Sequence, residues 1–325
     1  METIQNQFVQ LSHTLSQQII GQPQLIERLL IALLADGHLL VEGAPGLAKT
    51  RAIRLLGEHL EGSFHRVQFT PDLLPADLTG TEIYRPQQEV FEFQQGPLFH
   101  NLVLADEINR APAKVQSALL EAMAERQITV GQTTYPLQDP FLVMATQNPI
   151  EQEGTYPLPE AQLDRFLLHV AISYPAEDAE REILRLARRE ASTVEQPATN
   201  EIAINPISST QLKTAREQVL NTYMADNLED YLLQIILATR QPQRFGDDLA
   251  GWIQYGGSPR ATIALDRCAR SRAWLHGRDY VAPEDIKNVA FDVLRHRVLL
   301  TYEAEAEGIT VDRLVNELLQ RIPIP

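Results

Sequence analysis

Short runs of apolar residues alternate with amphipathic stretches through the first half of the chain. The runs that predict buried strands are residues 38–42, 64–67, 102–105, 141–145 and 167–172. Most of these runs are largely apolar, which is typical of parallel strands that are covered on both faces by helices. The last run ends at Ser173-Tyr174-Pro175. We therefore predict an α/β core with a parallel sheet over residues 1–174.

Helical patterns dominate the rest of the chain. The predicted helices are residues 176–191, 209–220, 228–240, 259–276, 283–294 and 311–321. Pro283-Glu284-Asp285 is a favourable helix opening, with proline first and acids that complement the helix dipole. The polar stretch 192–206 predicts a linker or loop. We predict a smaller, all-helical lid domain over residues 175–325.

Two stretches of the core alternate like strands around a polar turn. Residues 80–86 and 90–93 form one pair, and residues 127–135 form another around Gly131-Gln132. We predict hairpin inserts near residues 80–95 and 127–138. Loops often carry function, and surface hairpins without substrate contact are the alternative.

The first predicted strand leads into a glycine-rich turn and an amphipathic helix over residues 51–60. The turn has the sequence of a phosphate-binding loop: Gly43, Ala44, Pro45, Gly46, Leu47, Ala48, Lys49 and Thr50. Backbone N–H groups at a helix N-terminus attract an anion. Lys49 would contact the β- and γ-phosphates of a nucleotide, and Thr50 would hold Mg²⁺. A surface lysine is the alternative, but a cation in the first turn opposes the helix dipole.

One position departs from the usual pattern of this loop. Glycine is expected immediately before the lysine, and Ala48 stands there. An alanine Cβ is tolerable at that point only if φ stays negative, so we expect a negative φ at Ala48.

Two adjacent acids, Asp106 and Glu107, follow the apolar run 102–105. Parallel sheets place ligands at the carboxyl ends of their strands, so Asp106 would meet the metal held by Thr50. Glu107 can accept a proton from the attacking water or orient it. The alternative is a pair of solvated turn residues, which the upstream loop makes less favourable.

Asn148 follows the next apolar run, 141–145. Its amide can donate to a water molecule and accept from it. Asn-Pro is also a common turn signal. After the other two elements, Asn148 predicts a polar sensor near the γ-phosphate.

The ordered motifs of this chain resemble those of the AAA+ ATPases, and among them those of the MoxR family. The segments that carry the resemblance are residues 43–50, 68–75, 105–112, 145–149, 160–166 and 257–261. They lie within about residues 20–300, nearly the whole chain. Alanine before the P-loop lysine is itself common in MoxR-like proteins. The resemblance implies ATP and Mg²⁺ as ligands.

The family pattern also implies roles for individual residues. Asp106 and Glu107 match the Walker B acids, and Asn148 matches sensor 1. Arg165 matches the arginine finger that reaches the γ-phosphate of a neighbouring subunit, and Arg260 matches sensor 2 of the lid. For Arg165 the alternative is a salt-bridged arginine. Sequence physics supports Arg260, because Ser258-Pro259 would place it in a first helical turn where a cation needs an anion; a surface arginine is the alternative.

Five further residues have weaker assignments. Gly21 and Gln22 lie where AAA+ proteins start the segment that packs on adenine, although the glycine could equally mark a turn. Gln68 follows a predicted strand and is a candidate restraint on Glu107, with an ordinary strand-end glutamine as the alternative. Arg110 and Lys114 are expected to open the helix after the acids, on an interface or on a solvated face.

Composition agrees with an ordinary globular chain of 325 residues, with 44% hydrophobic and 22% charged residues. Its net charge of −15 opposes binding to phosphate backbones as a whole. The single cysteine, Cys268, excludes an internal disulfide and is expected to be a buried thiol. The N-terminus lacks the pattern of a signal peptide, and no apolar run is long enough for a membrane span. We expect a cytoplasmic protein.

The resemblance implies a homo-oligomeric ring, with a hexamer expected, that hydrolyses ATP and remodels or matures a client protein in a chaperone-like way. Metal-cofactor insertion with a von Willebrand factor A (VWA) domain partner is one form of this role, and the hairpins would project toward a ring pore. A nucleic-acid motor or transcriptional activator of the same fold is the alternative, disfavoured by the net acidity. A nucleotide-sensing scaffold, suggested by Ala48, is disfavoured by the intact acids.

Overall fold

A parallel five-stranded sheet with the order β2-β5-β8-β1-β9 forms the centre of the computed structural model, which describes residues 3–150, 154–192 and 205–324. Each neighbouring pair in this sheet is parallel. Its strands are β1 (Leu39–Glu42), β2 (Phe64–Gln68), β5 (Leu102–Asp106), β8 (Leu142–Gln147) and β9 (Leu168–Ala171). The predicted parallel sheet is confirmed.

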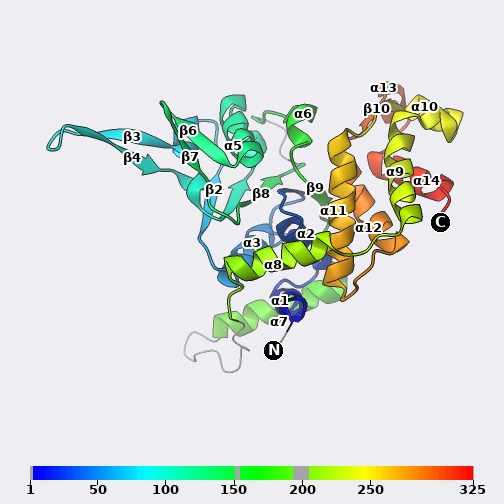
Figure 1. The fold of residues 1–325 in the computed structure, drawn as a ribbon, viewed down its shortest axis with the longest axis horizontal. Helices are drawn as coiled ribbons and strands as arrows, with labels where there is room; N and C mark the ends of the chain where they lie inside the picture. Colours follow the sequence, from blue (N-terminus) through cyan, green and yellow to red (C-terminus); the bar gives the residue numbers. More distant parts are fainter. Residues whose placement is uncertain (1–2, 151–153, 193–204, 325) are drawn as a thin grey trace.

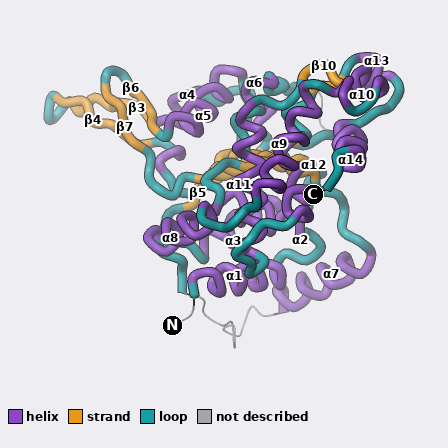
Figure 2. The backbone as a smooth tube through the Cα atoms, turned by 45° about the vertical axis from the view of Figure 1, so that its right-hand side comes forward, coloured by secondary structure: helices purple, strands orange, loops and turns teal. Residues whose placement is uncertain are grey.

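Helices cover both faces of the sheet. Successive residues of a strand point to opposite sides, so an apolar strand contributes buried side chains to both faces. On one face Leu39 and Val41 pack in a large apolar cluster, and on the other face Leu40 packs in a second, smaller one. Figure 2 shows the sheet between these two layers. The first layer includes α1 (Ile4–Gln18), α2 (Pro23–Leu34), α3 (Lys49–Glu58) and α8 (Ser209–Leu220), and the second includes α4 (Pro75–Thr79), η1 (Pro97–Phe99) and α5 (Ala113–Glu125).

The lid helices lie at one side of the sheet (Figure 1). They are α9 (Asp226–Arg240), α10 (Asp247–Trp252), α11 (Pro259–Leu275), α12 (Pro283–Leu294), α13 (Tyr302–Ala306) and α14 (Val311–Arg321), with η3 (Pro242–Arg244) and the short strands β10 (Ile253–Tyr255) and β11 (Leu299–Leu300). Helix α11 packs against α2 and α8, and α12 packs against β9. The larger apolar cluster is therefore continuous from the sheet into the lid. The boundary at residues 174 and 175 stays a prediction.

Both predicted hairpins are present and project from the side opposite the lid (Figure 1). Strands β3 (Gly80–Arg85) and β4 (Val90–Gln95) are antiparallel, as are β6 (Gln127–Val130) and β7 (Thr133–Pro136). Phe93 of the first hairpin stacks on Tyr135 of the second at a ring distance of 4.3 Å. Near the end of the first hairpin, Phe91 is 68% exposed. The hairpins support each other at their bases and leave an apolar tip in solvent.

The remaining helices connect these parts. They are η2 (Ile108–Arg110), α6 (Glu160–Leu163) and α7 (Glu177–Ser192). The predicted loop 192–206 lies largely outside the described residues. Cys268 is fully buried in α11, and burial raises the pKa of its thiol to about 12, as expected for an unreactive core thiol. Within the described ranges, no helix combines the length and apolar character that a membrane span requires.

Candidate functional site: a phosphate cavity and an arginine cavity

The phosphate-binding sequence forms an open concave loop between β1 and α3. A cavity of about 420 Å³ is lined by residues 45–51 together with polar side chains from β2, β5 and β8. Lys49 begins α3 and donates through Nζ to the carbonyl of Gly43. Gly46 has φ +84°, and a Cβ there would meet no atom within 4 Å. The loop therefore leaves free space where an anion would contact its N–H groups.

The expectation for Ala48 is wrong. Its φ is +59° and its ψ is 17°, in the left-handed region that glycine favours. Ala48 is the N-cap of α3, and its left-handed conformation costs an L-residue roughly 1 kcal/mol. Tertiary context therefore overrides the local preference of alanine at this position.

The two acids lie at the carboxyl end of β5, on the rim of the phosphate cavity. Asp106 is buried, and its Oδ1 accepts a hydrogen bond from Thr146 Oγ1 at 2.6 Å. The backbone N–H of Glu107 donates to the same Thr146 oxygen at 2.9 Å. Glu107 has φ +57°, a strained conformation that turns its side chain out of the strand direction. Thr146, which the sequence analysis did not single out, thus fixes both acids; its place at the end of β8 was the available signal.

Asn148 lines the same cavity and is largely buried. Its Oδ1 accepts a hydrogen bond from the N–H of Ile150 at 3.1 Å. The side-chain NH₂ is therefore the group that Asn148 can offer to a phosphate or a water molecule.

Gln68, at the end of β2, contacts Glu107. Its Nε2 donates to Glu107 Oε2 at 2.8 Å, and Arg110 also reaches that oxygen at 3.2 Å. The predicted position of Arg110 is wrong, because it lies in η2 and α5 begins only at Ala113. Pro112, which takes an extended ψ of 152°, separates the two helical segments. Lys114 lies in the first turn of α5 and is exposed.

A more apolar cavity of about 130 Å³ adjoins the phosphate-binding loop. Gln22 lines it, and Gln22 Nε2 donates to the carbonyl of Ser173 at 2.9 Å. Gly21 has φ +81° and packs against Pro175, where a Cβ would come within 2.7 Å of the proline ring. Its role is thus to allow a close chain approach. Three residues of α7 also line this cavity, namely Ile183, Leu186 and Ala187. The sequence analysis did not assign them to a site, although the amphipathic pattern of this helix was an available signal.

Arg165 and Arg260 line a third cavity, of about 280 Å³, at the other end of β1. Residues 36–38, which directly precede β1, also line it. Because the phosphate-binding loop follows β1, the strand separates the two cavities by roughly 13 Å. Neither arginine lines the phosphate cavity of its own chain.

The arginine cavity is lined by more cations than anions. Three further arginines line it, namely Arg126, Arg267 and Arg297. Arg297 pairs with Asp164 at 2.7 Å, and Arg126 pairs with Asp36 at 2.8 Å. Within the described part of the chain, no carboxylate lies within ion-pair distance of Arg165 or Arg260. Arg165 donates only to the carbonyl of Leu120, at 2.7 Å. The salt-bridged alternative for Arg165 therefore has no support among these residues.

Ser258 is the N-cap of α11, as predicted, and its Oγ accepts from the N–H of Arg260 at 3.2 Å. The same hydroxyl donates to Asp164 Oδ2 at 2.8 Å. Both oxygens of Asp164 are thus engaged, one by Ser258 and the other by Arg297. The carboxylate beside Arg165 in sequence is already satisfied, and Arg260 remains at a helix N-terminus, where a cation requires an external anion.

His38 forms the back wall of the arginine cavity. Its Nδ1 accepts from the N–H of Val143 at 3.1 Å, so its Nε2 carries the hydrogen that faces the Met123 carbonyl at 3.2 Å. Burial, together with the nearby Arg126 charge, lowers the pKa of His38 to about 4. His38 is therefore neutral near pH 7.

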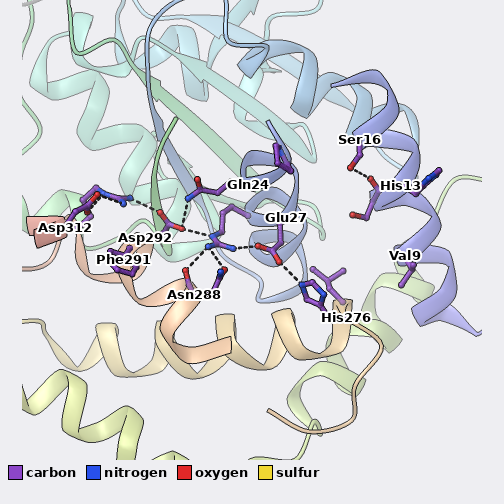
Figure 3. A pocket seen from close by; sticks show the side chains of 15 residues that line it. Val9, His13, Ser16, Gln24, Glu27, His276, Asn288, Phe291, Asp292 and Asp312 are labelled. Atoms are coloured by element: carbon purple, nitrogen blue, oxygen red, sulfur yellow. Dashed lines mark hydrogen bonds and ion pairs between the residues drawn. The ribbon is translucent and has the colours of Figure 1, made fainter. Parts of the chain in front are cut away.

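A larger cavity of about 840 Å³, between α1, α2, α11 and α12, differs in having paired charges (Figure 3). Arg28 Nε donates to Asp292 at 2.6 Å, and Arg28 also pairs with Glu27. Glu27 in turn contacts His276 at 2.8 Å. Because these groups satisfy one another, this network ties the lid to the core and leaves no charge for a ligand.

The phosphate cavity fits a nucleotide with a divalent cation. Thr50, Asp106 and Lys49 line one space, and hydroxyl and carboxylate oxygens are ligands that Mg²⁺ accepts. Burial lowers the pKa of Lys49, while Asp106 and Glu107 oppose that change. An added phosphate would supply the anion that this partly buried lysine lacks.

Comparison with known proteins agrees with this geometry. Residues 38–168 match the model of the ATPase family associated with various cellular activities (AAA), and residues 250–318 match an AAA lid domain. The chain is 48% identical to the Chaperone MoxR1 of Mycobacterium tuberculosis over 94% of this chain and 79% of that protein. It is 32% identical to the Protein MoxR of Methylorubrum extorquens over 94% of this chain and 92% of that protein.

A crystal structure from Cytophaga hutchinsonii, of a protein assigned as an ATPase, superposes with a TM-score of 0.89 and 45% sequence identity. The match covers 99% of this chain and 96% of that one. With a phosphate-binding loop, paired acids, a helical lid and relatives matched along nearly its full length, the chain belongs to the MoxR family of AAA+ ATPases.

Proposed function

We propose that this protein hydrolyses ATP at a site shared between two copies of the chain. The observation that carries the proposal is the separation of the two cavities by β1. One cavity has the groups that bind phosphate and activate water, and the other has two arginines, Arg165 and Arg260, that form no ion pair among the described residues. A head-to-tail arrangement of copies would bring the arginine cavity of one copy to the phosphate cavity of the next.

Each residue of the phosphate cavity has a defined task in this proposal. The loop N–H groups and Lys49 bind the β- and γ-phosphates of ATP, and Asn148 orients the γ-phosphate or the attacking water through its NH₂. Thr50 and Asp106 would hold Mg²⁺, which neutralises charge on the phosphate oxygens when it is bound. Glu107 accepts the proton of the attacking water once Gln68 releases its carboxylate.

Arg165 and Arg260 supply positive charge to the γ-phosphate from the neighbouring copy. A guanidinium suits this task because it stays charged and donates from a planar group to several oxygens. The lid thus acts on the nucleotide of the neighbour, because Arg260 is far from the phosphate-binding loop of its own chain.

The adenine of ATP would occupy the cavity lined by Gln22 and α7. Contact of the base with α7, which lines this cavity, would make the position of that helix sensitive to the nucleotide state. Repeated head-to-tail contacts would close into a ring of copies, and we propose a hexamer. We place this ring in the cytoplasm and propose no nucleic acid among its partners. The hairpin tips would contact a protein client, and ATP hydrolysis would drive the remodelling or maturation of that client. One form of this role is metal-cofactor insertion with a VWA-domain partner. The Mycobacterium tuberculosis relative is named as a chaperone.

Mixing two inactive variants tests the shared site. Lys49→Ala removes phosphate binding in one copy, and Arg165→Ala removes the donated arginine in the other. An equimolar mixture should recover roughly a quarter of wild-type phosphate release, because about one interface in four combines an intact loop with an intact arginine. Each variant alone should stay inactive.

The matched control mixes Lys49→Ala with Glu107→Gln. Both substitutions damage the phosphate cavity, so every interface in this mixture has an intact arginine and none has an intact phosphate cavity. This mixture should therefore show no recovery. Full activity of a monomer, or recovery in the control alone, would contradict the proposed site.

A further inference from the structure

Two side chains of β2 hold the two acids at the end of β5. Arg66 Nε and Nη2 both donate to Asp106 Oδ2, at 3.1 and 2.7 Å. Gln68 Nε2 donates to Glu107 Oε2 at 2.8 Å. Arg66 and Gln68 are two residues apart on a strand, so they share one face. The register places Gln68 opposite Asp106, which aligns this face with both acids.

Arg66 occupies the part of Asp106 that a metal would need. Asp106 Oδ1 already accepts from Thr146 at 2.6 Å, and Oδ2 accepts twice from Arg66. A divalent cation at Oδ2 would lie within roughly 4 Å of the guanidinium, where two like charges strongly repel each other. Arg66 and the cation therefore compete for the same oxygen.

The arginine can be displaced at little cost. The Arg66 side chain is 50% exposed, so water can solvate the guanidinium as soon as it leaves Asp106. Half-exposed ion pairs of this kind change an equilibrium constant by at most about fivefold. A divalent cation that also contacts phosphate oxygens has the stronger interaction.

Arg66 also orients the side chain that restrains Glu107. Its Nη2 donates to Gln68 Oε1 at 3.0 Å, which directs the Gln68 NH₂ toward Glu107. Departure of Arg66 removes the contact that fixes this amide. The positions of the metal ligand and of the water-activating glutamate are thus linked through one arginine.

We propose that Arg66 is a positioning residue that holds the oxygen of Asp106 a metal would need. On leaving when the metal–nucleotide binds, Arg66 frees Gln68 to release Glu107. This inference rests on the proposed function, because it concerns the same phosphate cavity. It explains how the acids stay inactive before the substrate and its metal are both present.

Mn²⁺ binding measures the competition directly. With protein in excess over ADP, so that all ADP is bound, the electron paramagnetic resonance signal of free Mn²⁺ gives its dissociation constant. Arg66→Gln should lower this constant by about two- to fivefold, since the competing cation is gone. Arg66→Lys should restore most of the competition.

Arg110→Gln is the matched control. Arg110 contacts Glu107 and not Asp106 in the hydrogen bonds of the described residues, so removing its charge tests for general electrostatic repulsion. An equal gain of Mn²⁺ affinity in Arg110→Gln would overturn the assignment of Arg66. Unchanged or weaker Mn²⁺ binding in Arg66→Gln, with a lowered melting temperature, would show that Arg66 only stabilises the sheet and would also overturn it.

The readout separates this inference from the proposed function. Mn²⁺ binding needs neither hydrolysis nor assembly. If the wild type binds no ADP, the proposed function fails; if it binds ADP and Mn²⁺ and Arg66→Gln shows no gain, only the role of Arg66 fails.

Discussion

The phosphate cavity and the arginine cavity lie at opposite ends of β1, and they differ in how their charges are balanced. In the phosphate cavity, Asp106 and Glu107 are both held by neighbouring side chains. In the arginine cavity, Arg165 and Arg260 form no ion pair with a carboxylate among the described residues. The acids of the phosphate cavity are held by hydrogen bonds within the chain, whereas Arg165 and Arg260 lack a charged partner among the described residues. The difference indicates that one copy of the chain carries both sets of groups but keeps them in two separate cavities.

The largest change in activity is expected when the water-activating group is removed from the phosphate cavity. Glu107→Gln should lower the turnover of ATP by about 10²- to 10⁴-fold, because general base catalysis contributes that much. ATP affinity should stay near the wild-type value, since Lys49 and the loop are intact. Phosphate release and equilibrium nucleotide titration give the two numbers. Wild-type turnover in this variant would remove Glu107 from the mechanism.

Acid should weaken the arginine cavity through His38. Its pKa is about 4 in the folded protein against 6.5 ordinarily, so the unfolded chain takes up the proton first. His38 contributes stability that is complete above pH 6.5 and is lost as the pH falls from 6.5 toward 4. The full difference is on the order of 3 kcal/mol.

Urea unfolding at pH 7 and at pH 4.5 measures this contribution. The His38→Gln variant keeps a donor and an acceptor but does not titrate, so its loss of stability between these pH values should be smaller than that of the wild type. The same loss in both proteins would mean that other groups cause the acid sensitivity.

Arg260→Ala should have a smaller effect than Glu107→Gln. One charge-assisted hydrogen bond to phosphate corresponds to about a 10- to 100-fold decrease in turnover. Nucleotide binding by the isolated subunit should not change, because Arg260 does not line its own phosphate cavity. Arg54→Ala, on the exposed face of α3, serves as an arginine control. Weaker ATP binding by monomeric Arg260→Ala would place this residue at its own site and break the comparison.

The smallest expected effect concerns the strained loop itself. Ala48→Gly relieves a left-handed conformation, but it also gives the unfolded chain more freedom, so the free energy of unfolding should change by less than about 1 kcal/mol. The matched variant Gly46→Ala introduces strain at φ +84° and should destabilise by roughly 1–2 kcal/mol. Urea titrations of both variants compare them. A large loss in Ala48→Gly would show that the alanine Cβ packs in the site.

By itself, the sequence determined the elements and the chemistry of the phosphate cavity. The apolar runs, the hairpin turns and the lid helices are local signals, and β1, β5, α11 and α12 begin and end within about two residues of their predicted bounds. The glycine-rich loop and the strand-end acids are also local, because parallel strands bring their carboxyl ends to one edge of a sheet.

Only the tertiary structure decided which distant residues meet. Arg165 and Arg260 are 95 residues apart (260 − 165), and packing of α11 against α2 and α8 places them in one cavity at the far end of β1. The positive φ of Ala48 and the contact of Arg66 with Asp106 likewise depend on neighbouring elements. Such contacts are set by burial of apolar surface between helices and sheet, a non-directional force that no local pattern encodes.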